Sequence, residues 1–187
     1  PVALSTSAEA VRERLQAEGF EVLLAGVPDS EDAKRVEVAA LCWQIMGQAD
    51  FTRTDSVIGF GGGSTTDLAG FVAGTWLRGV PLILIPTTLL GMVDAAIGGK
   101  TGVNTAEGKN LVGVFHAPSA VVVDLETLNT LNLNEILAGF GEVVKCGFIQ
   151  DAEILNLIEA DLAAATDPAS DAFLDIVIRC IRIKAQV

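Results

Sequence analysis

The chain has 187 residues, enough for a folded domain that buries about 70% of the surface exposed by its unfolded chain. Half of the residues are apolar and only 19% are charged, a composition that excludes general disorder. Lysine and arginine number 12 against 24 aspartate and glutamate residues, and the resulting net charge of −12 argues against nucleic acid or anionic membranes as partners.

The cysteines and the two ends of the chain bear on its location. Cys42, Cys146 and Cys180 match neither a disulfide framework nor a zinc-binding spacing, so we expect reduced thiols in a cytoplasmic protein. The densest apolar stretch, Val80–Leu90, is too short to span a bilayer, and no signal peptide opens the chain. Because the chain begins at Pro1 and its last helical pattern has no terminating residue, we expect both ends to be cut.

The first part of the chain alternates helical and extended patterns. Thr6 and Glu9 have capping-box spacing, and Gly19 stands where a left-handed residue ends a helix. Gly61–Gly63 then turn a short strand into a helix that Gly79 ends. In chain order we expect a helix over Ser7–Glu18, a strand over Glu21–Ala25, a turn at Pro28–Ser30, a helix over Glu31–Met46 with Val36, Leu41, Ile45 and Met46 available for the core, a strand over Ser56–Phe60 and a helix over Thr65–Arg78.

Further strands follow the glycine-rich helix. Gly70 and Gly74 share one face of that helix and predict close packing on the sheet. The sequence between Asp94 and Asn110 is rich in glycine and is predicted to be irregular, which in a compact domain usually indicates function. Buried strands are predicted over Pro81–Ile85 and Ala120–Val123, with a weaker extended pattern at Leu111–Phe115.

From Asn132 onward the strand patterns disappear. Helices are predicted over Asn134–Ile149, Ala152–Ala165 and Asp171–Val187. The alternation of helices and strands before them predicts a mainly parallel sheet covered by helices. We therefore expect an α/β domain over 1–131, with its first strand missing, followed by the beginning of an all-helical domain over 132–187.

The turn from Gly59 to Asp67 is the first candidate binding feature. Its glycines allow a ligand to approach the backbone, and the free amides of a helix start favour an anion such as a pyrophosphate. The alternative is a simple tight connection with Ser64 or Thr65 as the N-cap. Thr87 and Thr88 follow the next strand directly, so they lie at the carboxyl edge of the sheet, where open α/β folds bind ligands. Their alternative role is to cap a short helix.

Charged and other polar residues lie close together in the glycine-rich stretch after these threonines. Asp94, Lys100, Lys109 and Asn110 lie there among several glycines. Solvated loop charges are the ordinary explanation for such residues. An acidic protein that binds a phosphorylated ligand must nevertheless supply local positive charge, and the density of glycine beside lysine favours that interpretation.

Glu142 and Lys145 lie on one face of an otherwise apolar helix. They form either a surface ion pair or part of a cleft between the two domains. In a cleft, the carboxylate can bind a divalent metal and the lysine can take part in proton transfer. His116 is the only histidine, which excludes a site with several histidines in this chain, and we expect it to be structural.

Several motifs in order resemble the 3-dehydroquinate synthase family, within the sugar-phosphate cyclases. The resemblance covers essentially the whole chain and is densest from Gly61 to Lys145. The motifs are GGGSTTDLAGF from Gly61, WLRGV from Trp76, PTTLL from Pro86, VDAAIGGKTG from Val93, GKNLVG from Gly108 and GEVVK from Gly141.

The resemblance implies a Rossmann-like NAD-binding domain, a helical domain that holds zinc or cobalt, and a homodimer. Asp94, Lys100, Lys145 and Asn110 would act in catalysis and substrate binding. Arg78 would reach the substrate phosphate, either within its own chain or across a dimer interface, and Glu142 would be one of three metal ligands. The NAD site would comprise Asp29, Glu31, Lys34, Gly63, Ser64, Thr65, Thr66, Asp67, Thr87, Thr88, Lys100, Lys109, Thr127 and Thr130.

The implied reaction belongs to the shikimate pathway and converts 3-deoxy-D-arabino-heptulosonate 7-phosphate to 3-dehydroquinate and phosphate. It proceeds by transient oxidation, β-elimination of phosphate, reduction, ring opening and an internal aldol closure, so the enzyme is a lyase. The family's two metal-binding histidines would lie beyond Val187, and the 187 residues alone would bind NAD without turnover. The alternatives are another sugar-phosphate cyclase, such as a 2-deoxy-scyllo-inosose or valiolone-type synthase, and a non-catalytic NAD-binding fragment.

Overall fold

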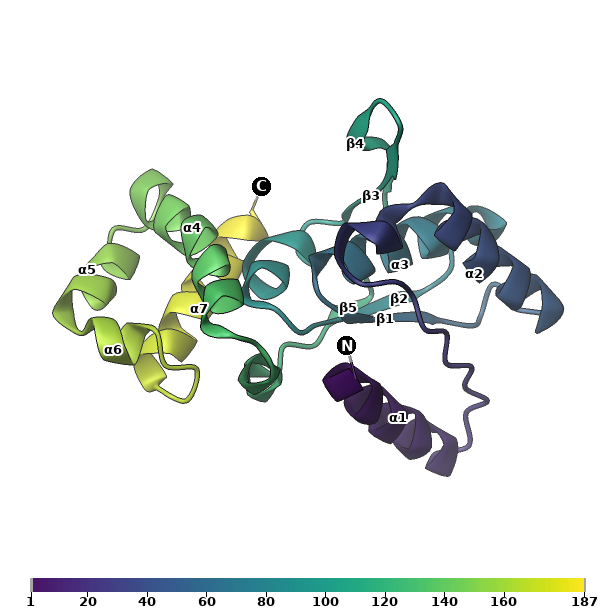
Figure 1. The fold of residues 1–187 in the computed structure, drawn as a ribbon, viewed down its shortest axis with the longest axis horizontal. Coiled ribbons are helices and arrows are strands. Elements are labelled where there is room, and N and C mark those ends of the chain that lie inside the picture. Colours follow the sequence, from purple (N-terminus) through teal and green to yellow (C-terminus); the bar gives the residue numbers. More distant parts are fainter. Residues whose placement is uncertain (1, 187) are drawn as a thin grey trace.

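The structure, a computed structural model, describes residues 2–186. Its elements divide into a mixed α/β part and a group of helices at the other end (Figure 1). The α/β part contains α1 (Val2–Ala17), η1 (Ser30–Lys34), α2 (Val36–Gln48), β1 (Val57–Gly61), α3 (Gly63–Thr75), η2 (Trp76–Arg78), β2 (Leu82–Pro86), the π-helical turn η3 (Gly91–Ala95), β3 (Lys100–Thr105), β4 (Gly108–Phe115) and β5 (Ala120–Val121). The 3₁₀ helix η4 (Leu125–Thr130) leads to α4 (Leu133–Ile149), α5 (Glu153–Ala160), α6 (Leu162–Ala165) and α7 (Asp171–Lys184).

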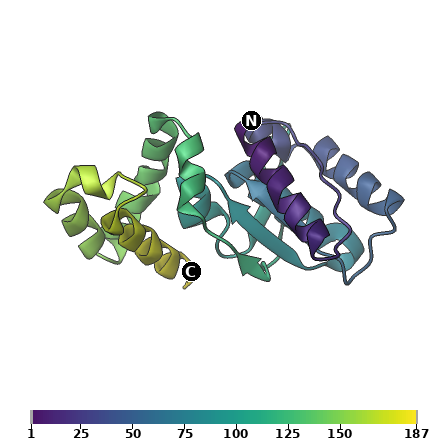
Figure 2. The ribbon, with the colours of Figure 1, turned by 90° about the horizontal axis from the view of Figure 1, so that it is seen from below.

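A three-stranded parallel sheet in the order β1-β2-β5 confirms the predicted fold class. The register pairs Val57 with Leu82 and Ile83 with Ala120, so all three strands end at one carboxyl edge. α2 and α3 lie on one side of the sheet and α1 on the other (Figures 1 and 2). Within residues 2–186 no helix is long and apolar enough to cross a membrane.

The glycine-rich stretch after Asp94 is ordered, so the prediction of an irregular segment was wrong. β3 and β4 form an antiparallel hairpin in which Thr101 pairs with Val114, and a bulge lies between Val103 and Thr105. The glycines obscure the alternation of residues along the strands, which explains why the pattern was missed. The hairpin packs on α3, where a Cβ added at Gly74 would lie 2.8 Å from a Val114 methyl carbon. The close packing expected from the glycines is confirmed, although the hairpin provides much of the contact.

One predicted N-terminal element is absent from residues 2–186, and another begins earlier than expected. The described residues contain no strand at Glu21–Ala25, because no neighbouring strand pairs with this segment, and Leu23 and Leu24 stay exposed. The first helix begins at Val2 rather than Ser7, so Thr6 lies inside it and does not cap it. Gly19 follows that helix with φ = 91°, as predicted.

The predicted helix Glu31–Met46 is broken at Arg35, whose extended backbone separates η1 from α2. The break changes the face of α2 that meets the core. Met46 is buried as expected, but Val36 and Leu41 are about half exposed. The core instead receives Ala39, with Val38, Cys42 and Trp43 packed against it.

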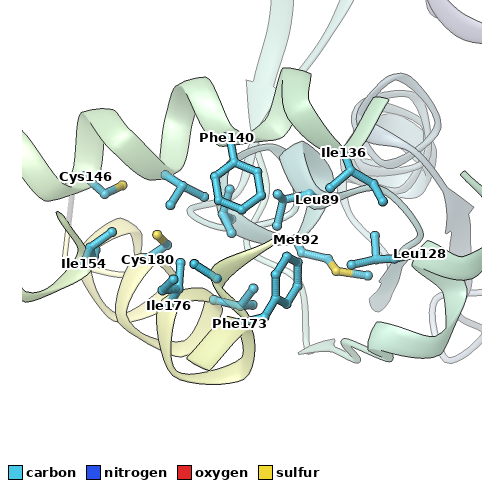
Figure 3. Close-up of a cluster of buried hydrophobic side chains, with 14 of the residues drawn as sticks. Leu89, Met92, Leu128, Ile136, Phe140, Cys146, Ile154, Phe173, Ile176 and Cys180 are labelled. Atoms are coloured by element: carbon cyan, nitrogen blue, oxygen red, sulfur yellow. The ribbon is translucent and has the colours of Figure 1, made fainter. Parts of the chain in front are cut away.

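The helical part has its own apolar cluster (Figure 3). The rings of Phe140 on α4 and Phe173 on α7 lie 6.2 Å apart, and Leu89 and Met92 from the segment after β2 join them. The predicted helix Ala152–Ala165 is divided at Asp161, whose side chain accepts a hydrogen bond from the Ala164 amide. The cluster therefore fixes α4 and α7 against the residues that follow the carboxyl edge of the sheet.

His116 and the cysteines behave as predicted. The ring nitrogen Nε2 of His116 lies 2.9 Å from the Val80 carbonyl oxygen, a structural contact in the tautomer that donates from Nε2. All three cysteines are free thiols.

Candidate functional site

The carboxyl ends of β1 and β2 meet at a cradle formed by backbone. α3 begins directly after β1 with Gly62 as its N-cap, and neither Ser64 nor Thr65 caps it. A Cβ at Gly62 would lie 3.1 Å from a Thr88 methyl carbon, and a Cβ at Gly63 would lie 3.1 Å from Ala95. The start of a 13-residue helix thus stays open to a ligand only because both residues are glycine.

The two threonines at this edge have different environments. The hydroxyl of Thr88 accepts a hydrogen bond from the Gly91 amide at 3.1 Å, so Thr88 does cap the turn that follows. Thr87 is fully buried, its amide donates to the Gly61 carbonyl at 2.9 Å, and its hydroxyl has no partner in the structure. Since buried hydroxyls are normally hydrogen-bonded, the Thr87 hydroxyl beside an open helix start fits an anionic cofactor such as a dinucleotide.

Thr66 of the same turn is committed to the backbone, because its hydroxyl donates to the Gly63 carbonyl at 2.9 Å. Asp67, one residue further, pairs with Lys34 of η1, and burial raises the pKa of its carboxyl although Lys34 opposes that effect. The ammonium of Lys34 also donates to the Asn110 side-chain oxygen. Three predicted residues from η1, α3 and β4 therefore lie in direct contact.

Glu31 connects the same region to the hairpin. Asn104 donates to its carboxylate at 2.7 Å, and Lys109 Nζ lies 3.6 Å from the same oxygen. The hydrogen bond from Asn104, with smaller contributions from Lys109 and Lys34, lowers the pKa of Glu31. Asn104 was not predicted, and its position at the hairpin bulge is what lets it reach Glu31.

A second polar group forms where the helical part meets η3. Lys145 Nζ lies 2.5 Å from Glu142 Oε1, and this contact, with a smaller effect of Asp94, raises the pKa of Lys145. Asp94 itself pairs with Lys184 at the end of α7. Asp94 lies on η3, which packs against both α3, the helix of the glycine cradle, and α4.

Lys184 was not a predicted site residue. Its side chain is only 18% exposed, although it carries a charge. The signal was present in the sequence, since Lys184 continues the apolar stripe that runs through Ile176 and Cys180. A lysine on the buried face of a helix needs a partner, and the structure identifies that partner as Asp94.

The structure does not bring every predicted residue to this edge. Arg78 lies beyond the far end of α3, separated from the cradle by 13 residues or about 20 Å of helix. The hydroxyls of Thr127 and Thr130 donate to carbonyls of their own 3₁₀ helix. Lys100 and Asp29 are exposed, at the base of the hairpin and before η1 respectively.

The donors of a metal site are incomplete in this part of the protein. Across residues 2–186 no three side chains of the metal-binding types come together. Glu142, the predicted ligand, is paired with Lys145 and belongs to no such group within residues 2–186. One carboxylate does not hold a zinc ion, which takes about three protein ligands at a catalytic site.

Comparison with known families identifies the chain. The family model described as 3-dehydroquinate synthase N-terminal matches residues 24–138, and the C-terminal model of that enzyme matches residues 139–187. The chain belongs to the 3-dehydroquinate synthase family. It is 63% identical over 187 residues to 3-dehydroquinate synthase of Leifsonia xyli subsp. xyli and 58% identical to that of Pseudarthrobacter chlorophenolicus. Each of these alignments includes 100% of this chain and 52% of the relative, so the chain spans about half the length of the curated relatives it matches.

Solved structures of sugar-phosphate cyclases have the same fold. 2-epi-5-epi-valiolone synthase from Streptomyces hygroscopicus subsp. jinggangensis, solved with NAD⁺ and Zn²⁺, matches with a TM-score of 0.89 and 32% identity over 97% of this chain and 51% of that one. 2-deoxy-scyllo-inosose synthase, solved with carbaglucose-6-phosphate, NAD⁺ and Co²⁺, gives a TM-score of 0.86 and 28% identity over 100% of this chain and 51% of that one. A glycerol dehydrogenase from Schizosaccharomyces pombe, at 18% identity, shares the fold alone.

Proposed function

We propose that this chain is part of a 3-dehydroquinate synthase, a lyase that converts 3-deoxy-D-arabino-heptulosonate 7-phosphate to 3-dehydroquinate and phosphate with NAD and a divalent metal. The observation that carries the proposal is the position of Asp94 on η3, a turn that packs against both the cradle helix α3 and α4, together with its ion pair to Lys184. Family membership supplies the reaction, and the cradle fits the phosphates of a dinucleotide.

The cofactor site is proposed along the carboxyl edge of the sheet. Gly63–Asp67 would hold the pyrophosphate at the start of α3, with Thr87 and Thr88 beside it. Asp29, Glu31, Lys34, Lys100, Lys109, Thr127 and Thr130 complete the set proposed by resemblance. Bound at this edge, NAD would supply reversible hydride transfer with a secondary alcohol of the substrate, and the C–H next to the resulting ketone would be acidic.

The residues of this chain bind and orient the substrate. Asp94 on η3 and Lys145 on α4 belong to elements that pack against each other, so both would contact one small molecule bound there. Lys184 adds a second cation beside Asp94. Lysines that surround a departing phosphate stabilise its growing negative charge, which is what β-elimination requires. Asn110, held by Lys34, would face the same substrate from the hairpin.

The metal is proposed to be zinc or cobalt, with Glu142 as one ligand. Since no three side chains of the metal-binding types come together within residues 2–186, the set of ligands would be completed from outside these residues. Glu142 is partly buried and already paired with Lys145, so its carboxylate is held in one orientation. Metal binding would therefore compete with, or rearrange, that ion pair.

We propose a cytoplasmic homodimer in which Arg78 acts in the second copy's site. The far position of Arg78 supports this assignment, because about 20 Å of helix separates it from the cradle of its own chain. Its backbone is left-handed, as is that of Leu77, and such strain often indicates a functional position. The boundary proposed near Leu131 directly precedes α4, although the apolar cluster of the helical part also contains Leu89, Met92 and Leu128 from before it.

Another sugar-phosphate cyclase activity remains the second candidate, because both cyclase structures match the chain at TM-scores of 0.86 and above. A non-catalytic NAD-binding role is the third. The first two candidates convert different sugar phosphates to different products, and the third converts none. Assays with different sugar phosphates therefore separate the three.

The test measures phosphate release from 3-deoxy-D-arabino-heptulosonate 7-phosphate by the full-length protein, with and without NAD and after metal chelation. Release that needs both cofactors and yields 3-dehydroquinate supports the proposal. Lys145→Ala and Glu142→Gln should each abolish turnover while the NAD dissociation constant stays within about threefold, a change of less than 1 kcal/mol. Glu159→Gln, an exposed site on α5, is the matched control. Wild-type rates in either site variant would refute the roles assigned here.

A further inference from the structure

Lys34 is a charged residue with almost no access to solvent. It is the last residue of η1 and only 3% exposed, a rare position for a lysine unless its charge is paired. Its ammonium contacts the carboxylate of Asp67 and the side-chain oxygen of Asn110. The two partners lie 33 and 76 residues away in the sequence, so the contacts are purely tertiary.

The two partners of Lys34 belong to different parts of the proposed site. Asp67 lies in the second turn of α3, next to the glycine cradle. Asn110 lies on β4 of the hairpin with a left-handed φ of 58°, a backbone state that needs local support. Its amide donates to the Asn104 side chain at 3.1 Å, and Asn104 in turn donates to Glu31 of η1. η1 thus holds the hairpin at two points.

A direct contact between Lys34 and the cofactor is the role that family resemblance implies. Two of the three N–H groups of the ammonium are directed at protein acceptors in a buried position, and the third remains for such a contact. Neighbouring Arg35 has a side chain that is 63% exposed, so it is a cation of similar position outside this buried contact.

We propose that Lys34 is a positioning residue that fixes Asn110 of the hairpin relative to Asp67 of the cofactor helix. The consequence for the reaction rests on the proposed function, because Asn110 is assigned there to the substrate. The connection itself does not depend on that assignment. Without Lys34, the hairpin would lose its link to α3 at this point, and the left-handed turn at Asn110 would lose its side-chain contact.

The first test needs no substrate. Hydrogen exchange of the amides of β3 and β4 is measured in the full-length protein, in Lys34→Met and in the matched control Arg35→Met. Lys34→Met should raise exchange over residues 100–115 by about tenfold, a typical scale for local opening, while Arg35→Met leaves it unchanged. Equal exchange in wild type and Lys34→Met would overturn the proposal.

Asn110→Ala is a second variant that keeps the proposal testable if Lys34→Met does not fold. It removes the same contact by changing the exposed residue, and Lys34 stays paired with Asp67. It should loosen the hairpin to a similar degree. Lys34→Arg, which keeps the cation, should restore part of the protection. If Asn110→Ala leaves exchange at the wild-type level, Lys34 does not act through Asn110.

The second test is a double-mutant cycle on kcat/KM. Asn110→Ala should lower kcat/KM by about tenfold or more in the wild-type background but by less than about threefold in Lys34→Met, because contacting residues couple. Additive losses together with a weakened NAD dissociation constant would instead make Lys34 a cofactor ligand. If the wild type releases no phosphate, the proposed function fails while the exchange experiment still decides the positioning role.

Discussion

Thr87→Val should make the protein more stable and a worse binder of NAD. The side chains have nearly the same volume, so the change removes one hydroxyl from a fully buried position. That hydroxyl has no partner, and a buried polar group left unpaired costs about 1–3 kcal/mol. The backbone bond from the Thr87 amide to the Gly61 carbonyl, at 2.9 Å, is retained in the variant.

The changes in stability and in NAD affinity both follow from the loss of the Thr87 hydroxyl. Removing the unpaired hydroxyl should raise the free energy of unfolding by about 1 kcal/mol, or roughly 2–4 °C in the melting temperature. A hydrogen bond to a charged phosphate contributes about 1.5–3 kcal/mol, so NAD affinity should fall by roughly 10-fold to 100-fold. Thr88→Val is the control, because its hydroxyl accepts from the Gly91 amide and its loss should lower stability by about 1 kcal/mol.

Calorimetry of the cofactor-free protein and titration with NAD measure the two quantities independently. The informative result is the opposite sign of the stability change at adjacent threonines. If Thr87→Val melts at or below the wild-type temperature, the Thr87 hydroxyl is satisfied within the protein. If its NAD affinity is unchanged, the hydroxyl does not face the cofactor, and the fit of the cradle to a dinucleotide is refuted.

Three further predictions concern packing, electrostatics and thiol chemistry. Gly139→Ala should destabilise by about 2 kcal/mol in thermal melts, since its Cβ would lie 2.7 Å from Leu89 Cβ, whereas Gly141→Ala, with nothing within 4 Å, should stabilise by about 0.5–1 kcal/mol; equal shifts would contradict the packing. Asn104→Ala should raise the pKa of Glu31 in an NMR titration. The lowered pKa of this carboxyl stabilises the folded protein at pH values above the ordinary pKa of glutamate, and this stabilisation is lost as the pH falls through the pKa in the folded protein. The free energies of unfolding of wild type and variant should therefore converge in acid. Burial raises the pKa of the Cys180 thiol, so it should react with a thiol reagent only on unfolding, and rapid labelling of the native protein would contradict its burial.

The sequence was sufficient for features set by neighbouring residues. The glycines after β1 and the threonines after β2 could be placed at one edge because parallel strands end on the same side. The N-cap assignment to Ser64 or Thr65 was wrong, because α3 begins at Gly63 and its N-cap is Gly62. Gly62 has no side chain to cap the helix, so the first amides of α3 stay open. The segment Glu21–Ala25 has the composition of a strand but no partner, and composition alone cannot supply one.

Contacts between distant segments were beyond the sequence patterns, and they decide how the site is arranged. Asp94 and Lys145 were both predicted, but the contact of the turn that carries Asp94 with both α3 and α4 depends on how the helical part packs against η3 (Figure 3). Lys184 reaches Asp94 only because the apolar stripe of α7 packs in the same cluster as Leu89 and directs the end of the helix back toward the sheet. The apolar cluster therefore sets the spacing of the charged groups, and a packing change such as Gly139→Ala should disturb the polar site without altering any of its residues.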